Sequence, residues 1–171
     1  MAFDNVHDFN DENNNKYIDF LNKELCFSIK KNSKEAILFL EAITTPAFSK
    51  KYNESKNVKN KIKDYDVNEF KGDAIITYIV VTEILKDEPV DRMHDKKTKL
   101  IENKHFIKMF NSLGLERFIF VDNVEDIGDK IKADVIESLA YAMHESSTKN
   151  LTTFLKNHLV KYEIIDYLKK Y

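Results

Sequence analysis

Residues that break helices are rare in this chain, and this constrains its fold more than any other feature. Only 3 Gly and 2 Pro occur in 171 residues, whereas glycine and proline usually make up about 7% and about 5% of a protein. Hydrophobic residues account for 43% of the chain, an ordinary fraction for a globular protein. A chain of this length fits one domain. The composition therefore predicts an all-α fold of helices joined by polar loops.

Apolar residues recur at helical spacing through most of the chain. The stripe over residues 17–25 predicts a first helix, and Ser33 is the predicted N-cap of a second helix that ends before Pro46. Further helices are expected over residues 67–85, 95–102, 104–113, 130–143 and 150–167. Gly114 is the expected C-cap glycine of the helix over residues 104–113. Between these helices, residues 50–63 are expected to form a polar connection that is helical in part, and the apolar stretch 115–121 is ambiguous.

The ends of the chain and its single cysteine limit the domain organisation and cellular location that the protein can have. Residues 1–14 are rich in Asp and Asn and are expected to form a flexible arm, followed by a single domain over residues 15–171. No apolar run approaches the ~18 residues that span a bilayer, and the acidic N-terminus is unlike a secretory or Arg-rich leader. Cys26 has no second cysteine to pair with, which fits a reducing compartment, and its apolar neighbours predict a core position. These features predict a cytoplasmic or nuclear protein with no membrane contact.

Lysines gather in two segments although the formal net charge is -2. Residues 50–63 contain six lysines and one acid, and residues 96–99 contain three more lysines. Such runs are usually solvated surfaces, and the alternative is contact with phosphate groups. The overall charge does not resemble that of a free-standing nucleic-acid binder, which is usually basic.

Two short acidic clusters lie in segments with helical periodicity. Glu69 and Asp73 are four residues apart. Asp134 and Glu137 are three residues apart, so each pair can lie on one helix face. Gly72, inside the first cluster, costs about 1 kcal/mol in a helix relative to alanine and indicates a close approach to the backbone. If the four carboxylates converge, a hard cation such as Mg²⁺ would offset their repulsion; the alternative is two pairs on solvated faces.

Five segments of the chain match, in order, the motifs of one known family. Residues 42–48 read A-I-T-T-P-A-F, residues 66–74 read D-V-N-E-F-K-G-D-A, and residues 133–142 read A-D-V-I-E-S-L-A-Y-A. Between the last two, residues 100–104 and 113–119 read L-I-E-N-K and L-G-L-E-R-F-I. In chain order, the five segments resemble the A-L-T-H-x-S-Y, E-R-L-E-F-L-G-D-A, L-V-S-N-K, G-L-x-x-Y-I and A-D-x-x-E-A-L-x-G-A motifs of the ribonuclease III catalytic domain.

The resemblance implies a ribonuclease-III-like helical bundle that cleaves double-stranded RNA with Mg²⁺, for which Mn²⁺ can substitute. The family's four catalytic carboxylates, which hold the metal, fall on Glu69, Asp73, Asp134 and Glu137. Hydrolysis would leave 5′-phosphate and 3′-hydroxyl ends. Family members are homodimers, and Phe70 falls on the motif phenylalanine that packs across the dimer interface.

The resemblance also bears on how RNA is held. Because the chain ends at Tyr171, no double-stranded-RNA-binding domain is expected after the catalytic domain. Affinity is then expected from the catalytic domain itself or from an RNA-binding partner protein. The lysines expected to contact RNA are Lys56, Lys59, Lys61, Lys63, Lys104 and Lys108. Sequence preference is expected to be weak, since double-stranded RNA is recognised mainly by shape, phosphates and 2′-hydroxyl groups.

Several residues depart from the family's pattern without removing a carboxylate. Asp66, Asn68 and Lys71 replace a glutamate and two leucines of the first motif. Tyr141 interrupts the small residues that follow the second motif, and Thr45 stands where the family often has histidine. These changes concern dimer packing and substrate approach more than the chemistry.

The alternative function is that of a non-catalytic relative, serving as a scaffold, a dimerisation module or an RNA-binding protein in a ribonucleoprotein complex. Such relatives typically lose one or more of the four acids, and this chain keeps all four. Zinc and di-iron sites fit poorly, because the histidines lack zinc-ligand spacing and neither acidic cluster contains Glu-x-x-His.

Overall fold

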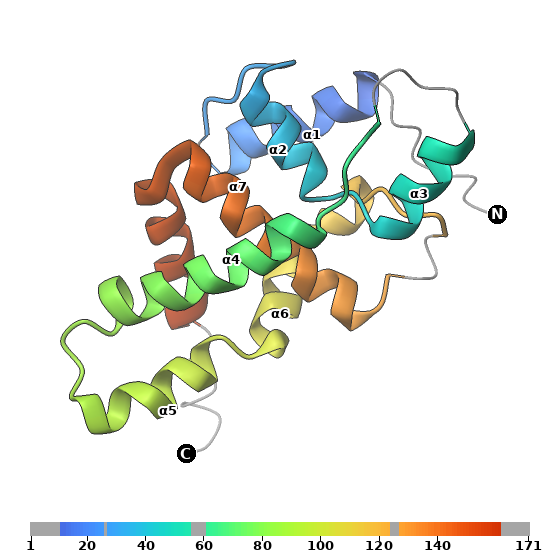
Figure 1. The fold of residues 1–171 in the computed structure, drawn as a ribbon. Coiled ribbons are helices and arrows are strands. Elements are labelled where there is room, and N and C mark those ends of the chain that lie inside the picture. Colours follow the sequence, from blue (N-terminus) through green and yellow to red (C-terminus); the bar gives the residue numbers. More distant parts are fainter. Residues whose placement is uncertain (1–10, 26, 56–60, 124–126, 162–171) are drawn as a thin grey trace.

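The protein is built from helices, which confirms the all-α prediction (Figure 1). The computed structural model describes residues 11–25, 27–55, 61–123 and 127–161. The α-helices are α1 (Asp11–Glu24), α2 (Lys34–Glu41), α3 (Pro46–Ser55), α4 (Asp66–Ile79), α5 (Val90–Leu100), α6 (Asn103–Leu113) and α7 (Asp129–Leu155). Short π- or 3₁₀-helical turns are η1 (Val80–Ile84), η2 (Leu115–Phe118) and η4 (Lys156–Val160). None of the helices in these ranges has the length and apolar character needed to cross a membrane.

The predicted helix signals at Ser33, Pro46 and Gly114 are confirmed. The Ser33 hydroxyl oxygen accepts a hydrogen bond from the Ala36 amide at 3.0 Å and caps α2. Helix α2 ends at Glu41, before Pro46 as predicted, and Pro46 is the first residue of α3, a position where its missing N–H costs nothing. Gly114 ends α6 with a φ of 61°, a left-handed conformation that glycine adopts without strain.

Two predicted boundaries were wrong at their N-terminal ends. Helix α1 begins at Asp11, inside the segment expected to be a flexible arm, and the 2.7 Å ion pair between Glu12 and Lys16 supports its first turns. Helix α5 begins at Val90 rather than residue 95, because Pro89 can stand directly before a helix and its carbonyl accepts from the Arg92 amide. The expected core position of Cys26 lies outside the described residues.

The two helices expected over residues 130–143 and 150–167 form one element, α7, which is interrupted by a break at Ser147; residues 162–167 lie outside the described residues. This residue has extended backbone angles, φ -164° and ψ 105°. Its hydroxyl oxygen accepts from the Asn150 amide at 3.3 Å, which caps the second half of the helix. That half continues through η4 with Leu151, Leu155 and Leu159 buried.

Helix α4 lies across α7, and this pair makes the most extensive helix–helix contact among the described residues (Figure 1). The long helix expected over residues 67–85 is confirmed, with η1 as its last turn. Its inner face buries Gly72, Ile76 and Ile79. Its outer face leaves Val67 and Phe70 exposed. Large apolar side chains exposed on one face of a helix indicate an interface there.

A small backbone junction joins the segments around α4. The Phe120 amide donates to the Ile43 carbonyl at 2.9 Å, and the Thr45 amide donates to the Phe120 carbonyl at 3.0 Å. The Tyr65 amide donates to the Thr44 carbonyl at 3.0 Å. The ambiguous stretch 115–121 is therefore a 3₁₀ turn followed by a single β-bridge between Thr44 and Phe120. This junction fixes the chain directly before α4.

Candidate metal centre

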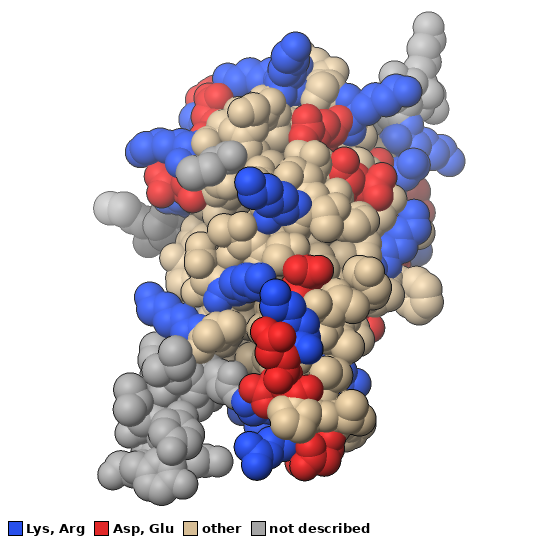
Figure 2. Space-filling view, turned by 90° about the vertical axis from the view of Figure 1, so that its left-hand side faces the viewer, with Lys and Arg blue, Asp and Glu red and all other residues tan. Residues whose placement is uncertain are grey.

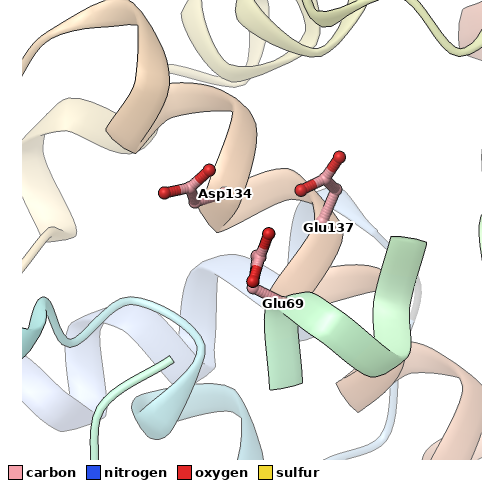
Figure 3. A group of neighbouring side chains, drawn as sticks. All are labelled: Glu69, Asp134 and Glu137. Carbon is pink, nitrogen blue, oxygen red and sulfur yellow. The ribbon is translucent and has the colours of Figure 1, made fainter. Parts of the chain in front are cut away.

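Three carboxylates from two helices converge at the crossing of α4 and α7 (Figure 3). Glu69 comes from α4, whereas Asp134 and Glu137 come from α7. Each offers one oxygen, and these oxygens lie within 4.8 Å of one another. Asp134 and Glu137 are only 7% and 8% exposed. Their arrangement matches the convergence that the spacing of the acids suggested.

Gly72 allows the two helices to come this close. A Cβ atom at Gly72 would lie 1.8 Å from the Glu137 carbonyl oxygen and 2.5 Å from its carbonyl carbon. No side chain fits there, because real Cβ contacts are never below about 3 Å. Since Glu69 is three residues before Gly72, this backbone contact brings its carboxylate to Glu137. The predicted close approach at Gly72 is confirmed.

The fourth predicted ligand, Asp73, stands at the edge of this cluster. Its side chain is exposed, and it is not among the three residues whose oxygens converge. Its charge nevertheless acts on the cluster, since it is the nearby charge that raises the pKa of Glu137 most. The structure thus brings three of the four predicted carboxylates together and leaves the fourth beside them.

Negative charge accumulates at this site. Burial first, and then the charges of Asp73, Glu69 and Asp134, together raise the pKa of Glu137 to about 8. The pKa of Glu69 is raised as well; burial is the largest cause, and the charge of Asp134 is the second. Several carboxylates held together in a partly dry site favour either proton uptake or a bound cation. Carboxylate oxygens are the donors that Mg²⁺, Mn²⁺ and Ca²⁺ prefer, so the residues fit a hard divalent metal ion.

Two residues that were not predicted from the sequence, Lys130 and Tyr65, hold Asp134. The Lys130 ammonium lies 2.7 Å from Asp134 Oδ2. The Tyr65 hydroxyl makes a long hydrogen bond of 3.5 Å to the same oxygen, and burial and the nearby carboxylates raise the pKa of Tyr65, so it remains a donor. Lys130 is four residues before Asp134, a spacing that could have indicated it; Tyr65 carries no such signal. Lys130 also lowers the pKa of Glu137 and so opposes the acids around it.

The lysines predicted to bind RNA are dispersed. Lys56 and Lys59 lie outside the described residues. Lys61 is exposed and Lys63 pairs with Glu41 at 3.8 Å, both just before Tyr65. Lys104 and Lys108 lie on α6, where Lys104 pairs with Glu102 at 2.5 Å. On the face in Figure 2, basic and acidic side chains alternate, so this side carries no uniformly basic surface.

Two of the departures from the motifs contact each other. The Lys71 ammonium lies 4.6 Å from the centre of the Tyr141 ring and donates to the Tyr141 hydroxyl at 3.2 Å. The two residues bridge α4 and α7 on the exposed side of the crossing. A polar cation–π contact thus joins the helices there.

We expect the affinity of the site for Mg²⁺ to rise with pH. Below the pKa of about 8, Glu137 carries a proton that must leave before the carboxylate can bind a cation. Affinity should therefore increase by up to about tenfold per pH unit and level off above pH 8. Titration calorimetry between about pH 6 and about pH 9, repeated in buffers of different ionisation enthalpy, measures both affinity and proton release. A constant affinity with no proton release would contradict this expectation.

Comparison with known proteins shows a similarity to one family. Residues 66–147 match the family model of the ribonuclease III domain. The chain is 28% identical over 160 residues to Ribonuclease 3 of Aquifex aeolicus, covering 91% of this chain and 65% of that protein. It is 28% identical over 156 residues to Ribonuclease 3 of Campylobacter jejuni, covering 85% and 62%. The chain thus spans slightly less than two thirds of the length of these relatives.

Solved structures agree on the fold. The nuclease domain of ribonuclease III from Campylobacter jejuni superposes with a TM-score of 0.64 at 22% identity, covering 86% of this chain and 96% of that domain. A second structure of that domain, which concerns a region involved in dimer formation, gives a TM-score of 0.64 at 21% identity and covers 85% and 96%. The motifs, the helical fold and the family match agree: the chain is similar to the ribonuclease III domain, whose family model covers residues 66–147.

Proposed function

We propose that this protein is an endoribonuclease that cleaves double-stranded RNA by metal-dependent hydrolysis. The observation that carries the proposal is the convergence of Glu69, Asp134 and Glu137 within 4.8 Å at a helix crossing. Such a group of oxygen donors suits Mg²⁺, which phosphoryl-transfer sites commonly use. The similarity to proteins named Ribonuclease 3 supports the same chemistry.

The residues have separable roles in this proposal. Glu69, Asp134 and Glu137 hold the metal ions, and Asp73 joins them from the edge of the site. Bound Mg²⁺ would supply Lewis acidity toward the phosphate and lower the pKa of an attacking water. Lys130 is a positioning residue, since it holds Asp134 by an ion pair. Attack of water oxygen on phosphorus with departure of the 3′ oxygen leaves 5′-phosphate and 3′-hydroxyl ends.

The chain before α4 is held firmly enough to present basic residues to RNA. The Asn53 amide group donates to the Ile62 carbonyl at 2.9 Å and accepts from the Ile62 amide at 3.0 Å. This two-bond clamp fixes the segment that carries Lys61 and Lys63 next to Tyr65. We propose that these lysines contact the phosphates of the duplex, which is recognised by shape and backbone.

We also propose a homodimer formed through the outer face of α4. Phe70 is 78% exposed there, and Val67 and Tyr78 are likewise exposed. Large apolar side chains in one exposed stripe of a helix are typical of a protein interface. A nuclease domain of similar fold has a region involved in dimer formation, which supports dimer formation by this chain.

Replacing Phe70 by alanine should weaken the dimer by about tenfold or more while leaving the monomer folded. Buried aromatic residues dominate interface energies, whereas Phe70 contributes little to the core of its own chain. Sedimentation equilibrium of the wild type and the variant measures the change. Val90→Ala is the matched control, because Val90 is an 83% exposed apolar residue on a different helix, α5. Equal dimer affinity for wild type and Phe70→Ala would exclude Phe70 from the interface.

A cleavage assay tests the proposed activity. The purified protein should cut long double-stranded RNA in Mg²⁺ or Mn²⁺, should be inactive in EDTA, and should leave double-stranded DNA intact. End-labelling of the products would identify the 5′-phosphate. Binding of double-stranded RNA without cleavage in either metal would favour the non-catalytic alternative of a scaffold or RNA-binding module.

A further inference from the structure

A shallow groove between α1 and η2 carries chemistry that the metal centre does not use. Its volume is about 380 Å³. Two half-buried aromatic rings, Phe20 and Phe118, line it together with the cations Lys16, Lys23 and Arg117. Aromatic rings interleaved with basic groups are typical of surfaces that bind unpaired nucleotides.

Arg117 is the central cation of this groove. Its guanidinium carbon lies 4.7 Å from the centre of the Phe118 ring and 5.3 Å from that of the Phe20 ring. Within the described part of the chain, no carboxylate pairs with it. A guanidinium that lies on aromatic rings keeps its N–H edge available for an anion and its other face available for stacking.

The choice of arginine at this position is itself informative. Of the 27 Lys and Arg residues in the chain, only Arg92 and Arg117 are arginine. Lysine carries the same charge but lacks the planar group that stacks on rings and donates two parallel hydrogen bonds. Arg117 stacks on two rings in the described part of the chain, a contact for which arginine is better suited than lysine.

The other charges along the groove have partners of their own. Asp19 pairs with Lys31 at 3.0 Å, and Glu24 lies 3.4 Å from Lys23. Lys16 pairs with Glu12 at 2.7 Å. Each acid along the groove thus has a lysine within 3.4 Å. The acids along the groove therefore leave the Arg117 charge available to a ligand.

The groove is connected to the metal centre by short links along the backbone. Phe118 is two residues before Phe120, which forms the backbone junction with Ile43 and Thr45 described above. The neighbouring Thr44 carbonyl accepts from Tyr65, whose hydroxyl reaches Asp134. A nucleotide held in the groove would thus be held in a defined relation to the carboxylates.

We propose that this groove binds an unpaired nucleotide of the RNA substrate, with the base stacked on the Arg117 guanidinium and the phosphate on its N–H edge. This inference rests on the proposed RNA-cleaving function and extends it. The substrate class is then double-stranded RNA with a single-stranded flank or loop, and the groove contacts the unpaired part.

Fluorescence anisotropy with a labelled single-stranded oligouridine in EDTA tests the groove without cleavage. Arg117→Ala should weaken binding by about tenfold, the usual effect of losing one stacking contact. Arg117→Lys should lose most of the affinity as well, because charge alone does not replace the stack. Arg92→Ala is the matched control and should bind like the wild type, since Arg92 is exposed on α5. Circular dichroism checks that each variant folds. The double charge reversal Lys16→Glu with Lys23→Glu, at two exposed positions of the same groove, should also weaken binding of the oligouridine.

The outcomes separate this inference from the proposed activity. Unchanged oligouridine binding by Arg117→Ala would overturn the inference. Binding of an acidic peptide such as polyglutamate to the groove, without binding of the oligouridine, would overturn it as well. Cleavage of a fully paired, blunt duplex should be the same for Arg117→Ala and the wild type. If the wild type binds the oligouridine through Arg117 but cleaves no duplex in Mg²⁺, the proposed activity fails while the groove stands. If the wild type cleaves the duplex and does not bind the oligouridine, the inference alone fails.

Discussion

Replacing Gly72 by alanine should destabilise the protein by ~3 kcal/mol or more and abolish metal binding. The new methyl group would meet the Glu137 backbone at 1.8 Å, so α4 and α7 must separate. Overpacking against flexible side chains already costs about 1–3 kcal/mol, and a backbone carbonyl can move less. For a protein of this size, the melting temperature should fall by about 6 °C or more.

Gly128→Ala is the matched control for this experiment. A Cβ atom at Gly128 meets nothing within 4 Å, and its φ of -76° suits any residue. Because Gly128 is the N-cap of α7, alanine there should cost less than about 1 kcal/mol. Thermal unfolding of both variants and the wild type measures the difference. Equal melting temperatures for Gly72→Ala and Gly128→Ala would show that the helices do not meet as closely as described.

Glu137→Gln should remove activity and metal binding while preserving the fold. The amide keeps the shape of the side chain but loses the charge that would bind a cation. Loss of a partner outside the ligand shell already costs about 10–100-fold in metal affinity, so loss of this ligand should cost at least ~100-fold. Calorimetric titration with Mn²⁺ and single-turnover cleavage of double-stranded RNA measure the two effects.

The same variant should be more stable than the wild type in EDTA at high pH. The pKa of Glu137 is raised from 4.5 to about 8 in the folded protein, so the stability it contributes is present at low pH and is lost as the pH rises through about 8. Glutamine does not ionise and keeps its contribution. Glu145→Gln, an exposed carboxylate on the same helix, is the control and should change neither metal affinity nor activity. A Glu137→Gln variant with wild-type cleavage would remove Glu137 from the proposed site.

The sequence predicts those parts of the structure that depend on local spacing. Ser33 and Gly114 mark helix ends because a cap involves neighbouring residues only. The acidic pairs could be placed on helix faces for the same reason. Their convergence required a contact between α4 and α7, for which Gly72 and the family motifs were the available signals.

What the sequence does not predict depends on contacts between distant segments. Tyr65 reaches Asp134 because the backbone junction at Thr44 fixes the start of α4, and no pattern in the sequence contains that junction. Lys71 and Tyr141 are separate departures from the motifs in sequence, and only the fold shows that they contact each other. Helical spacing puts Asp73 on the same side as Glu69 but does not reveal that Asp73 is exposed at the edge.

Anomalous diffraction from crystals grown with Mn²⁺ shows whether the carboxylates at the helix crossing hold divalent metal ions. We expect an anomalous peak coordinated by oxygens of Glu69, Asp134 and Glu137, with Asp73 bound directly or through water. The peak should be absent from crystals of the Glu137→Gln variant. Wild-type crystals saturated with Mn²⁺ that show no peak at this position, or a peak only elsewhere, would contradict metal binding by these carboxylates.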